Sequence, residues 1–153
     1  MDTSGQIHTK APRAMLADAL RDPLILAQLL PKGCKLDQTG PDAFGFVLKR
    51  YFGPIELALP GTITIESKGN LHWLNFRGAH QLFGKANMAL TLILTESKGV
   101  TNLDYKGSLQ ASGLAGRLLG LVKQKRVDER VRKGLVTFKT LAIAAQIKKA
   151  GNG

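Results

Sequence analysis

The alternation of apolar and polar side chains over residues 34–111 is the feature that most constrains the fold of this chain. Within 88–94 every second residue is large and apolar, and the same period of two recurs around Phe44 and Leu103. Successive side chains of a β-strand point to opposite faces, so this period is typical of strands with one apolar face. Turn-forming residues separate the alternating segments. The pattern therefore predicts an antiparallel sheet.

Turn signals mark the ends of the predicted strands. Lys68-Gly69-Asn70 and Ser97-Lys98-Gly99 are typical of hairpin turns, while Gly53-Pro54 and Pro60-Gly61 are expected to interrupt the chain between strands. The strands expected between these signals span 43–49, 55–59, 62–66, 71–77, 85–95 and 100–111.

A short first strand over Gln6–Thr9 and two short helices are predicted before the sheet. Pro12 suits the first turn of a helix that continues through Leu20, because proline has no amide hydrogen for this turn to leave unpaired. Asp22-Pro23 is typical of a helix start, with the Asp carboxylate as N-cap, and predicts a second helix over 24–30.

One long helix is predicted after the sheet. Ser112 can cap this helix, and the apolar spacing continues from about Leu114 to about Lys148. Three glycines near its start, at 113, 116 and 120, have two interpretations. They could admit a phosphate to free amide hydrogens beside Arg117. We favour close packing on the sheet, because the parallel-sheet context of a phosphate-binding loop is missing.

The positive charge of the chain is concentrated at its C-terminal end. Of a net charge of +11, residues 113–153 contribute eight, with ten Lys or Arg against Asp128 and Glu129. A basic run in this segment is expected either to dock on an anionic membrane or acidic partner, or to be a solvated helix face. Specific nucleic-acid recognition is not expected, because interleaved aromatic residues are missing. The basic run comprises Lys123, Lys125, Arg126, Arg130, Arg132 and Lys133.

The 153 residues are expected to form one domain over 1–150, followed by a short flexible tail at 151–153. The lone Cys34 cannot form an internal disulfide and the N-terminal residues include no apolar run for export, which predicts a reducing cytoplasmic setting. No apolar stretch approaches the roughly 20 residues that cross a bilayer. Any membrane contact is therefore expected to be peripheral, at the inner face.

Candidate catalytic and metal-binding residues are few. His8, His72 and His80 lack the spacing of metal ligands, and Cys34 has no evident neighbouring base. His72 alternates with Leu74, so it is either a polar side chain in a cavity or a satisfied or exposed histidine of the ordinary kind. We expect no metal, no cofactor and no enzyme activity.

Short motifs along nearly the whole chain occur in an order typical of one protein family. They are Leu20-Arg21-Asp22-Pro23, Leu30-Pro31-Lys32-Gly33-Cys34, Phe52-Gly53-Pro54-Ile55, Gly61-Thr62-Ile63, Leu103-Asp104-Tyr105 and Ser112-Gly113-Leu114-Ala115-Gly116-Arg117-Leu118-Leu119-Gly120. On these motifs the chain resembles the carbon monoxide dehydrogenase G-subunit family. Its superfamily also holds START lipid-transfer domains, polyketide cyclases and the birch-pollen allergen. The chain departs from the family pattern at Lys32, at the single late aromatic Phe138, and in lacking a hydrophobic tail.

The resemblance implies an α+β helix-grip fold, in which a curved seven-stranded antiparallel sheet surrounds a long C-terminal helix, with two short helices after the first strand. It further implies an apolar cavity between sheet and helix. The side chains expected to face this cavity, each with ordinary core packing as the alternative, are Phe44, Phe46, Leu48, Ile55, Leu57, Leu74, Phe76, Met88, Leu90, Leu92, Leu103, Tyr105, Leu118 and Phe138.

Three hypotheses for function follow from the residues and the resemblance. The first is a binding protein for an apolar small molecule, lipid or quinone that also approaches a membrane or partner. The second is an accessory protein that recruits a molybdenum hydroxylase and has no ligand of its own. The third is a cyclase- or hydrolase-like enzyme, which requires His72, Asp104 and Tyr105 to converge on one pocket.

Overall fold

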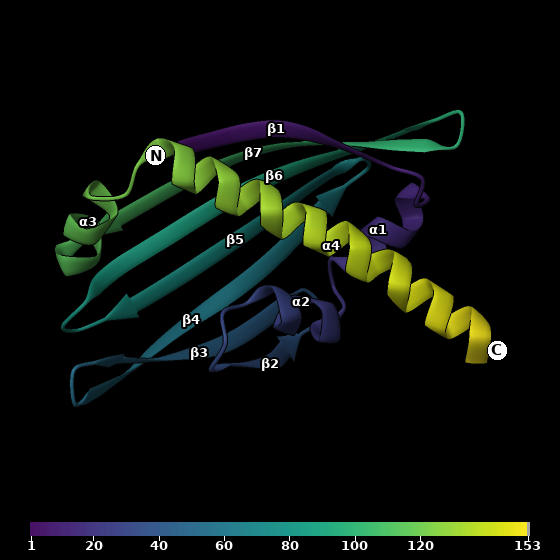
Figure 1. The fold of residues 1–153 in the computed structure, drawn as a ribbon. Helices are drawn as coiled ribbons and strands as arrows, with labels where there is room; N and C mark the ends of the chain where they lie inside the picture. Colours follow the sequence, from purple (N-terminus) through teal and green to yellow (C-terminus); the bar gives the residue numbers. More distant parts are fainter. Residues whose placement is uncertain (153) are drawn as a thin grey trace.

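Seven antiparallel strands form one curved sheet in the computed structural model, and a long helix, α4, lies across its concave face (Figure 1). The structure describes residues 1–152, without the side chains of Phe52 and of 149–152. The predicted tail at 151–153 thus has no described side chains, and Gly153 lies outside the described residues. The strands lie in the order β1-β7-β6-β5-β4-β3-β2.

The strands and helices have the following bounds. The strands are β1 (Asp2–Thr9), β2 (Cys34–Gly40), β3 (Ala43–Phe52), β4 (Ile55–Lys68), β5 (Leu71–His80), β6 (Gly84–Ser97) and β7 (Val100–Ser112). The helices are α1 (Arg13–Ala19), α2 (Pro23–Leu29), α3 (Gly113–Gly120) and α4 (Gln124–Asn152). This is the predicted helix-grip order of one strand, two short helices, six strands and a closing helical segment.

The predicted hairpin turns are confirmed by the backbone. Lys98 and Gly99 both have positive φ, at 52° and 77°, between the paired residues Ser97 and Val100. Two such residues make a tight turn whose twist matches that of the flanking strands. Gly69 and Gly53, with φ of 59° and 63°, serve the other two-residue turns. These turns explain why β3 to β7 pair in sequence order.

The expectation that Pro60-Gly61 separates two strands is wrong, because β4 continues through both residues and pairs them with β3. Pairing between β4 and β5 begins only at Gly61, opposite Gly78. Pro60 therefore lies where the β5 ladder ends, a position that tolerates a missing amide hydrogen. Gly61 also makes room for a neighbour, since a Cβ there would overlap the Phe46 ring.

The two short helices begin close to the predicted residues. Asp22 caps α2 by accepting a hydrogen bond from the Leu24 amide at 3.0 Å, and Pro23 occupies the first turn. α1 begins one residue after Pro12 and buries Leu16 and Ala19. The N-cap prediction for α2 is therefore confirmed.

The expectation of a single long C-terminal helix is wrong, because the chain breaks between α3 and α4 at 121–123. Leu121 and Val122 donate to the carbonyls of Leu118 and Leu119 at 3.1 and 3.0 Å, which tightens the last turn and ends α3. α3 packs on β6 and β7, whereas α4 leaves in another direction to cross the sheet (Figure 1). The Ser112 side chain makes no capping hydrogen bond, contrary to expectation.

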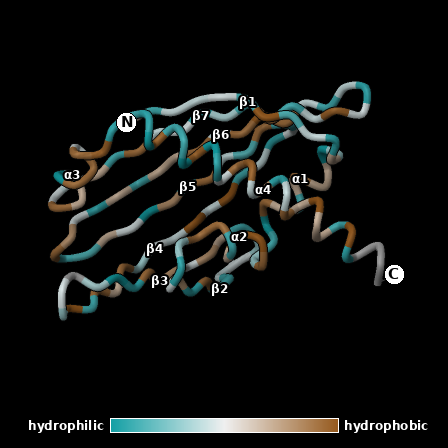
Figure 2. Tube along the Cα trace, viewed as in Figure 1, coloured by the Kyte–Doolittle hydropathy of each residue, from teal (hydrophilic) through white to brown (hydrophobic). Residues whose placement is uncertain are grey.

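The core lies between the concave face of the sheet and the helices. Its fully buried side chains include Leu16, Ile63, Leu92 and Leu103, each at most 1% exposed. Figure 2 shows several hydrophobic residues on α3, followed by hydrophilic ones in the first turns of α4. The hydrophobic residues of α3 are thus followed in the chain by a hydrophilic start of α4.

Candidate functional site

Two apolar hollows lie side by side on the concave face of the sheet. The inner hollow, of about 280 Å³, lies under α4 and is lined by Leu20, Leu26, Leu29, Leu30, Ile63, Leu74, Phe76, Met88, Leu90, Leu92, Arg130, Val131, Gly134, Leu135 and Phe138. The outer hollow, also about 280 Å³, lies toward α3 and is lined by Phe46, Leu48, Leu59, Pro60, Phe76, Arg77, Gly78, Ala79, His80, Phe83, Gly84, Ala86, Asn87, Met88, Leu109 and Ala115. Phe76 and Met88 line both hollows, so the two are adjacent.

The inner hollow exists because of how α4 is supported. α4 contacts β1 at one edge of the sheet and α2, which packs on β2, toward the other edge, and it also contacts α1. Along β1 it is held by hydrogen bonds from Arg132 to the Gln6 carbonyl at 3.2 Å and from Lys139 to the His8 carbonyl at 3.1 Å. Between these supports α4 spans the curved middle of the sheet. Leu135 and Phe138 extend into that space without filling it.

Arg130 is the charged side chain at the margin of the inner hollow. The other fourteen lining residues are Gly, Val, Leu, Ile, Met or Phe. Arg130 is exposed, on the part of α4 that also contributes Val131 and Gly134 to the lining. The inner hollow therefore suits an apolar body, with a place for a polar or anionic group only at the Arg130 margin.

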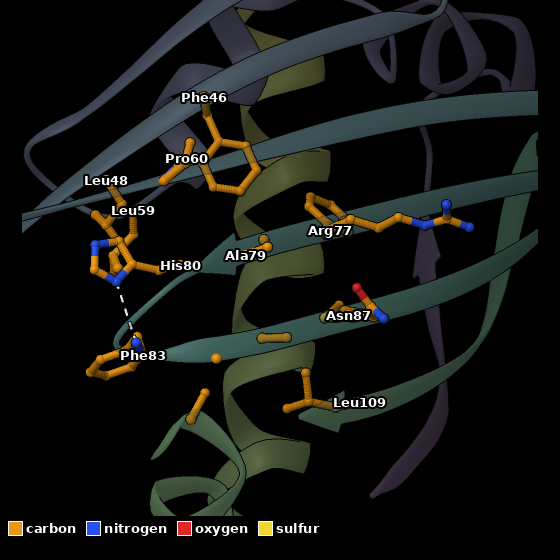
Figure 3. Close-up of a pocket in the computed structure, with 16 residues that line it drawn as sticks. Phe46, Leu48, Leu59, Pro60, Arg77, Ala79, His80, Phe83, Asn87 and Leu109 are labelled. Atoms are coloured by element: carbon orange, nitrogen blue, oxygen red, sulfur yellow. Dashed lines mark hydrogen bonds between the residues drawn. The ribbon is translucent and has the colours of Figure 1, made fainter. Parts of the chain in front are cut away.

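His80 supplies a polar group beside the outer hollow (Figure 3). Its Nδ1 accepts hydrogen bonds from the amides of Leu82 and Phe83 at 3.1 and 3.3 Å. An Nδ1 that accepts in the neutral imidazole leaves the proton on Nε2. Figure 3 shows the His80 ring near Leu48 and Leu59, whereas the Arg77 side chain extends away from them.

Most of the predicted cavity residues lie around the hollows. Leu74, Leu90, Leu92 and Phe138 line the inner one, Phe46 and Leu48 the outer one, and Phe76 and Met88 both. The period of two located all of these residues except Phe138 of α4, because it shows which side chains of a strand share one face of the sheet.

The remaining predicted cavity residues lie elsewhere. Phe44 and Leu103 are each 1% exposed and pack within the core, and Tyr105 packs across Gly5, where a Cβ would overlap its hydroxyl. Leu57 is half-buried near the β3–β4 turn, outside the lining of either hollow. Ile55 at that turn is 61% exposed, and Leu118 on α3 is 41% exposed. Leu118 lies away from the hollows because the helix breaks before it can cross the sheet.

Apart from Phe138, the helical side of the lining was not predicted from the sequence. Leu20, Leu26, Leu29 and Leu30 come from α1, α2 and the residues that follow them. Their helical spacing indicates a buried face but does not indicate whether that face meets the sheet or an empty space. Ile63 was missed although its strand was expected, and its alternation with Ile65 could have identified it.

His72, Asp104 and Tyr105 do not converge on a pocket. His72 is 4% exposed, and its Nδ1 lies 2.7 Å from the Ser67 hydroxyl. Asp104 and Tyr105 are consecutive in β7, so their side chains point to opposite faces. None of the three lines either hollow. The enzyme hypothesis therefore loses the residues on which it depended, and His72 is a satisfied buried histidine.

The surroundings of Cys34 favour the protonated thiol over the thiolate that would act as a nucleophile. Burial raises the pKa of the Cys34 thiol above its ordinary value, against a smaller opposite effect from Arg50. Within residues 1–152, no three His, Cys, Asp or Glu side chains are placed to hold a metal ion. Over the same described part of the chain, no helix combines the length and apolarity needed to span a membrane.

The glycines at the start of α3 serve close packing. A Cβ at Gly116 would lie 2.8 Å from the Ala111 carbonyl oxygen, and one at Gly113 would lie 3.1 Å from Gly84 Cα. The Ala115 amide, which a phosphate would need, donates to the Phe83 carbonyl at 2.7 Å. The structure thus agrees with close packing at Gly113 and Gly116, whereas a Cβ at Gly120 would have no neighbour within 4 Å.

The structure distributes the basic run around α4 instead of placing it on one face. Lys123, Lys125, Arg126 and Lys133 are exposed, and Lys125 lies 4.0 Å from Glu129. Arg130 borders the inner hollow, and Arg132 is bonded to β1. Only part of the predicted run is therefore free to meet an external surface.

Comparisons with known proteins agree with the fold. The model of the carbon monoxide dehydrogenase G-subunit (CoxG) family matches residues 5–140. A conserved protein from Geobacillus kaustophilus superposes with a TM-score of 0.70 at 21% identity, covering 98% of this chain and 97% of that one. A STAR-related lipid transfer protein from Xanthomonas axonopodis gives 0.58 at 14% identity, covering 91% and 84%. The di-domain ARO/CYC StfQ from the steffimycin biosynthetic pathway gives 0.58 at 12% identity, covering 98% of this chain and 52% of that one. A search of curated proteins finds no match.

Proposed function

Since the chain belongs to the carbon monoxide dehydrogenase G-subunit (CoxG) family, we propose that it binds an apolar small molecule, lipid or quinone between the sheet and α4. The pair of adjacent apolar hollows supports this proposal most directly. Each hollow is just below the roughly 300 to 1,000 Å³ of typical ligand sites, so a ligand that extends across both fits best. Met88 lies between them and is adaptable in shape.

Docking on a charged surface forms the second part of the proposal. The exposed basic residues at the start of α4 approach an anionic membrane or an acidic partner, while the hollows hold the ligand. Each Lys or Arg near an anionic leaflet contributes about 1 kcal/mol, so several together give reversible binding. The residues proposed for this role are Lys123, Lys125, Arg126 and Lys133, because Arg130 borders the inner hollow and Arg132 is bonded to β1.

A second candidate function is favoured by the family match. A member of this family could serve as an accessory protein that recruits a molybdenum hydroxylase without a ligand of its own. Capture of such an enzyme by a variant with filled hollows would favour this function. The ligand-binding hypothesis instead requires that filling the hollows abolishes function.

Gly134 provides a test of ligand binding. It lines the inner hollow, and a Cβ built on it has no neighbour within 4 Å. Gly134→Phe is therefore expected to fill the hollow without a clash. We expect it to weaken binding of a lipophilic fluorescent probe by roughly tenfold or more, about 1.4 kcal/mol.

Gly134→Ala is the matched control. It should leave most of the hollow open and stabilise α4 by about 0.5–1 kcal/mol. Fluorescence titration and urea denaturation measure the two effects. Equal probe affinity in both variants, or no probe bound by the wild type, would refute the proposed site.

A further inference from the structure

Exposed apolar side chains gather at the end of the sheet that carries α3. Thirteen large apolar residues are exposed within the described part of the chain, and six of them, besides Val122, lie at this end. They come from α3 and the residue after it, from the β5–β6 turn and from the β3–β4 hairpin. We call them the apolar rim: Tyr51, Ile55, Leu82, Leu114, Leu118 and Leu121.

The leucines of α3 form one outward face. Leu114, Leu118 and Leu121 follow the spacing i, i+4, i+7, which places them on the same side of a helix. They are 46%, 41% and 82% exposed. The sequence placed Leu118 at the cavity between sheet and helix, but α3 ends before it can cross the sheet. Exposed apolar side chains on one helix face do not stabilise the protein in water, so a binding partner is expected to cover them.

The apolar rim borders the mouth of the outer hollow at α3 and at the β5–β6 turn. Leu114 precedes Ala115 and Leu82 precedes Phe83, and both following residues line that hollow. The Ala115 amide donates to the Phe83 carbonyl at 2.7 Å, which joins α3 to the β5–β6 turn. Leu82 is 75% exposed beside this junction. The rim and the mouth therefore form one continuous surface.

Basic side chains flank the apolar rim. Arg117 lies within α3, Lys123 and Arg126 follow it, Lys85 pairs with Ser112 at its start, and Arg50 precedes Tyr51. Among the residues that the structure describes, these five form no ion pair within 4.0 Å.

The acidic side chain at the hairpin is already paired. Glu56 lies 3.7 Å from the Lys49 ammonium and accepts from the Tyr51 hydroxyl at 3.3 Å. The surface thus combines protruding apolar side chains with unpaired positive charge.

We infer that the apolar rim docks on an anionic lipid bilayer, with the outer hollow opening onto the membrane. Apolar side chains that enter the acyl boundary, with cations at headgroup level, are the pattern of interfacial binding. An acidic protein would match the positive charges, but its binding would not require apolar side chains that protrude from three separate elements. The route of a ligand from membrane to hollow rests on the proposed function, whereas the docking itself does not.

Vesicle sedimentation tests this surface. The probe is a vesicle of phosphatidylcholine and phosphatidylglycerol, compared with phosphatidylcholine alone. The variant Leu114→Gln, Leu118→Gln, Leu121→Gln should bind the anionic vesicles roughly tenfold or more weakly than the wild type. Because the three positions are exposed, the variant is expected to fold as the wild type does, and circular dichroism checks this.

A matched control removes equally exposed apolar side chains elsewhere. Leu24→Gln, Val136→Gln, Ile147→Gln changes residues that are 75%, 37% and 67% exposed, on α2 and α4. This variant should sediment as the wild type does. Equal losses in both triple variants, or no loss in the α3 variant, would overturn the inference.

Charge and insertion are tested separately. Lys123→Gln with Arg126→Gln should weaken binding and reduce its salt dependence. Leu121→Trp in a Trp73→Phe background should show a blue-shifted emission with anionic vesicles. Sedimentation without any blue shift would mean that another surface binds, and capture of an acidic protein in place of vesicles would also overturn the inference.

A final comparison separates docking from ligand binding. The α3 triple variant should keep its affinity for the lipophilic probe in vesicle-free buffer, because its changed side chains do not line a hollow. Wild-type docking without probe binding would refute the proposed ligand binding and leave the docking surface intact. Probe binding without wild-type docking would refute the docking surface alone.

Discussion

At the scale of single residues, His72 shows how a polar side chain is accommodated beside the core. Its Nδ1 lies 2.7 Å from Ser67 Oγ, which accepts a hydrogen bond from Arg21 at 2.9 Å. Arg21 also pairs with Asp42 at 2.5 Å. Burial lowers the pKa of His72 below its ordinary value of 6.5, and the nearby Arg21 and Arg13 lower it further. The imidazole is therefore neutral in the folded protein at neutral pH.

This lowered pKa predicts a pH-dependent stability. Between the folded pKa and 6.5, the unfolded chain binds a proton that the folded chain refuses, so stability falls as the pH decreases. The contribution of neutral His72 to the free energy of unfolding is complete above the pKa of the unfolded state. It is lost progressively as the pH falls from there through the pKa of the folded state. His72→Gln should cost about 1 kcal/mol at pH 8 and should flatten the slope between about pH 7 and pH 5. Urea denaturation at several pH values measures the difference, and parallel slopes in the two proteins would contradict it.

At the scale of elements, the position of α3 on the sheet depends on a glycine. Gly116 brings α3 within contact of β7, because its missing Cβ would lie 2.8 Å from the Ala111 carbonyl oxygen. Gly120, in the same helix, has no neighbour within 4 Å of such a Cβ. Two glycines of one helix thus have different physical roles. One allows a close approach, and the other only weakens the helix.

This difference predicts opposite effects of the same substitution. Gly116→Ala should destabilise the protein by about 1–3 kcal/mol, because backbone atoms must move apart. Gly120→Ala should stabilise it by about 0.5–1 kcal/mol, because alanine loses less backbone entropy in a helix. Urea denaturation compares both with the wild type. The packing explanation fails if the two variants shift stability in the same direction.

The same elements show what the sequence predicts and what it does not. Alternation identified the inward faces of β5 and β6, and Asp22-Pro23 identified the start of α2, because these signals depend on neighbours in the chain. The break at 121–123 and the unbroken β4 through Pro60-Gly61 depend on contacts between distant segments. The helical lining from Leu26 and Leu29 was missed for that reason too. The local sequence pattern thus predicts which side of a strand or helix is buried. The size of the space between sheet and helix depends instead on the contacts that hold the helix in place.

At the scale of the whole molecule, α4 acts as an arch over the inner hollow. It contacts β1 at one edge of the sheet and α2, which packs on β2, toward the other edge, and α1 supports it as well. Ala142, 2% exposed, lies in the crevice where α4 meets Met15 and Ala19 of α1. A small residue there lets α4 lie low over the sheet. The height of the arch, and with it the volume of the hollow, is therefore set in part by a residue outside the lining.

A larger side chain at Ala142 should change the volume of the inner hollow although Ala142 does not line it. Ala142→Leu overfills the contact with α1, so we expect a loss of about 1–3 kcal/mol in stability and a changed affinity for the lipophilic probe. Ala144→Leu, at an exposed position of the same helix, should shift stability by no more than about 0.5 kcal/mol and leave probe affinity unchanged. Denaturation and probe titration on both variants measure these effects. If Ala142→Leu lowers stability but leaves probe affinity at the wild-type value, the hollow does not depend on the height of α4, and the arch explanation is wrong.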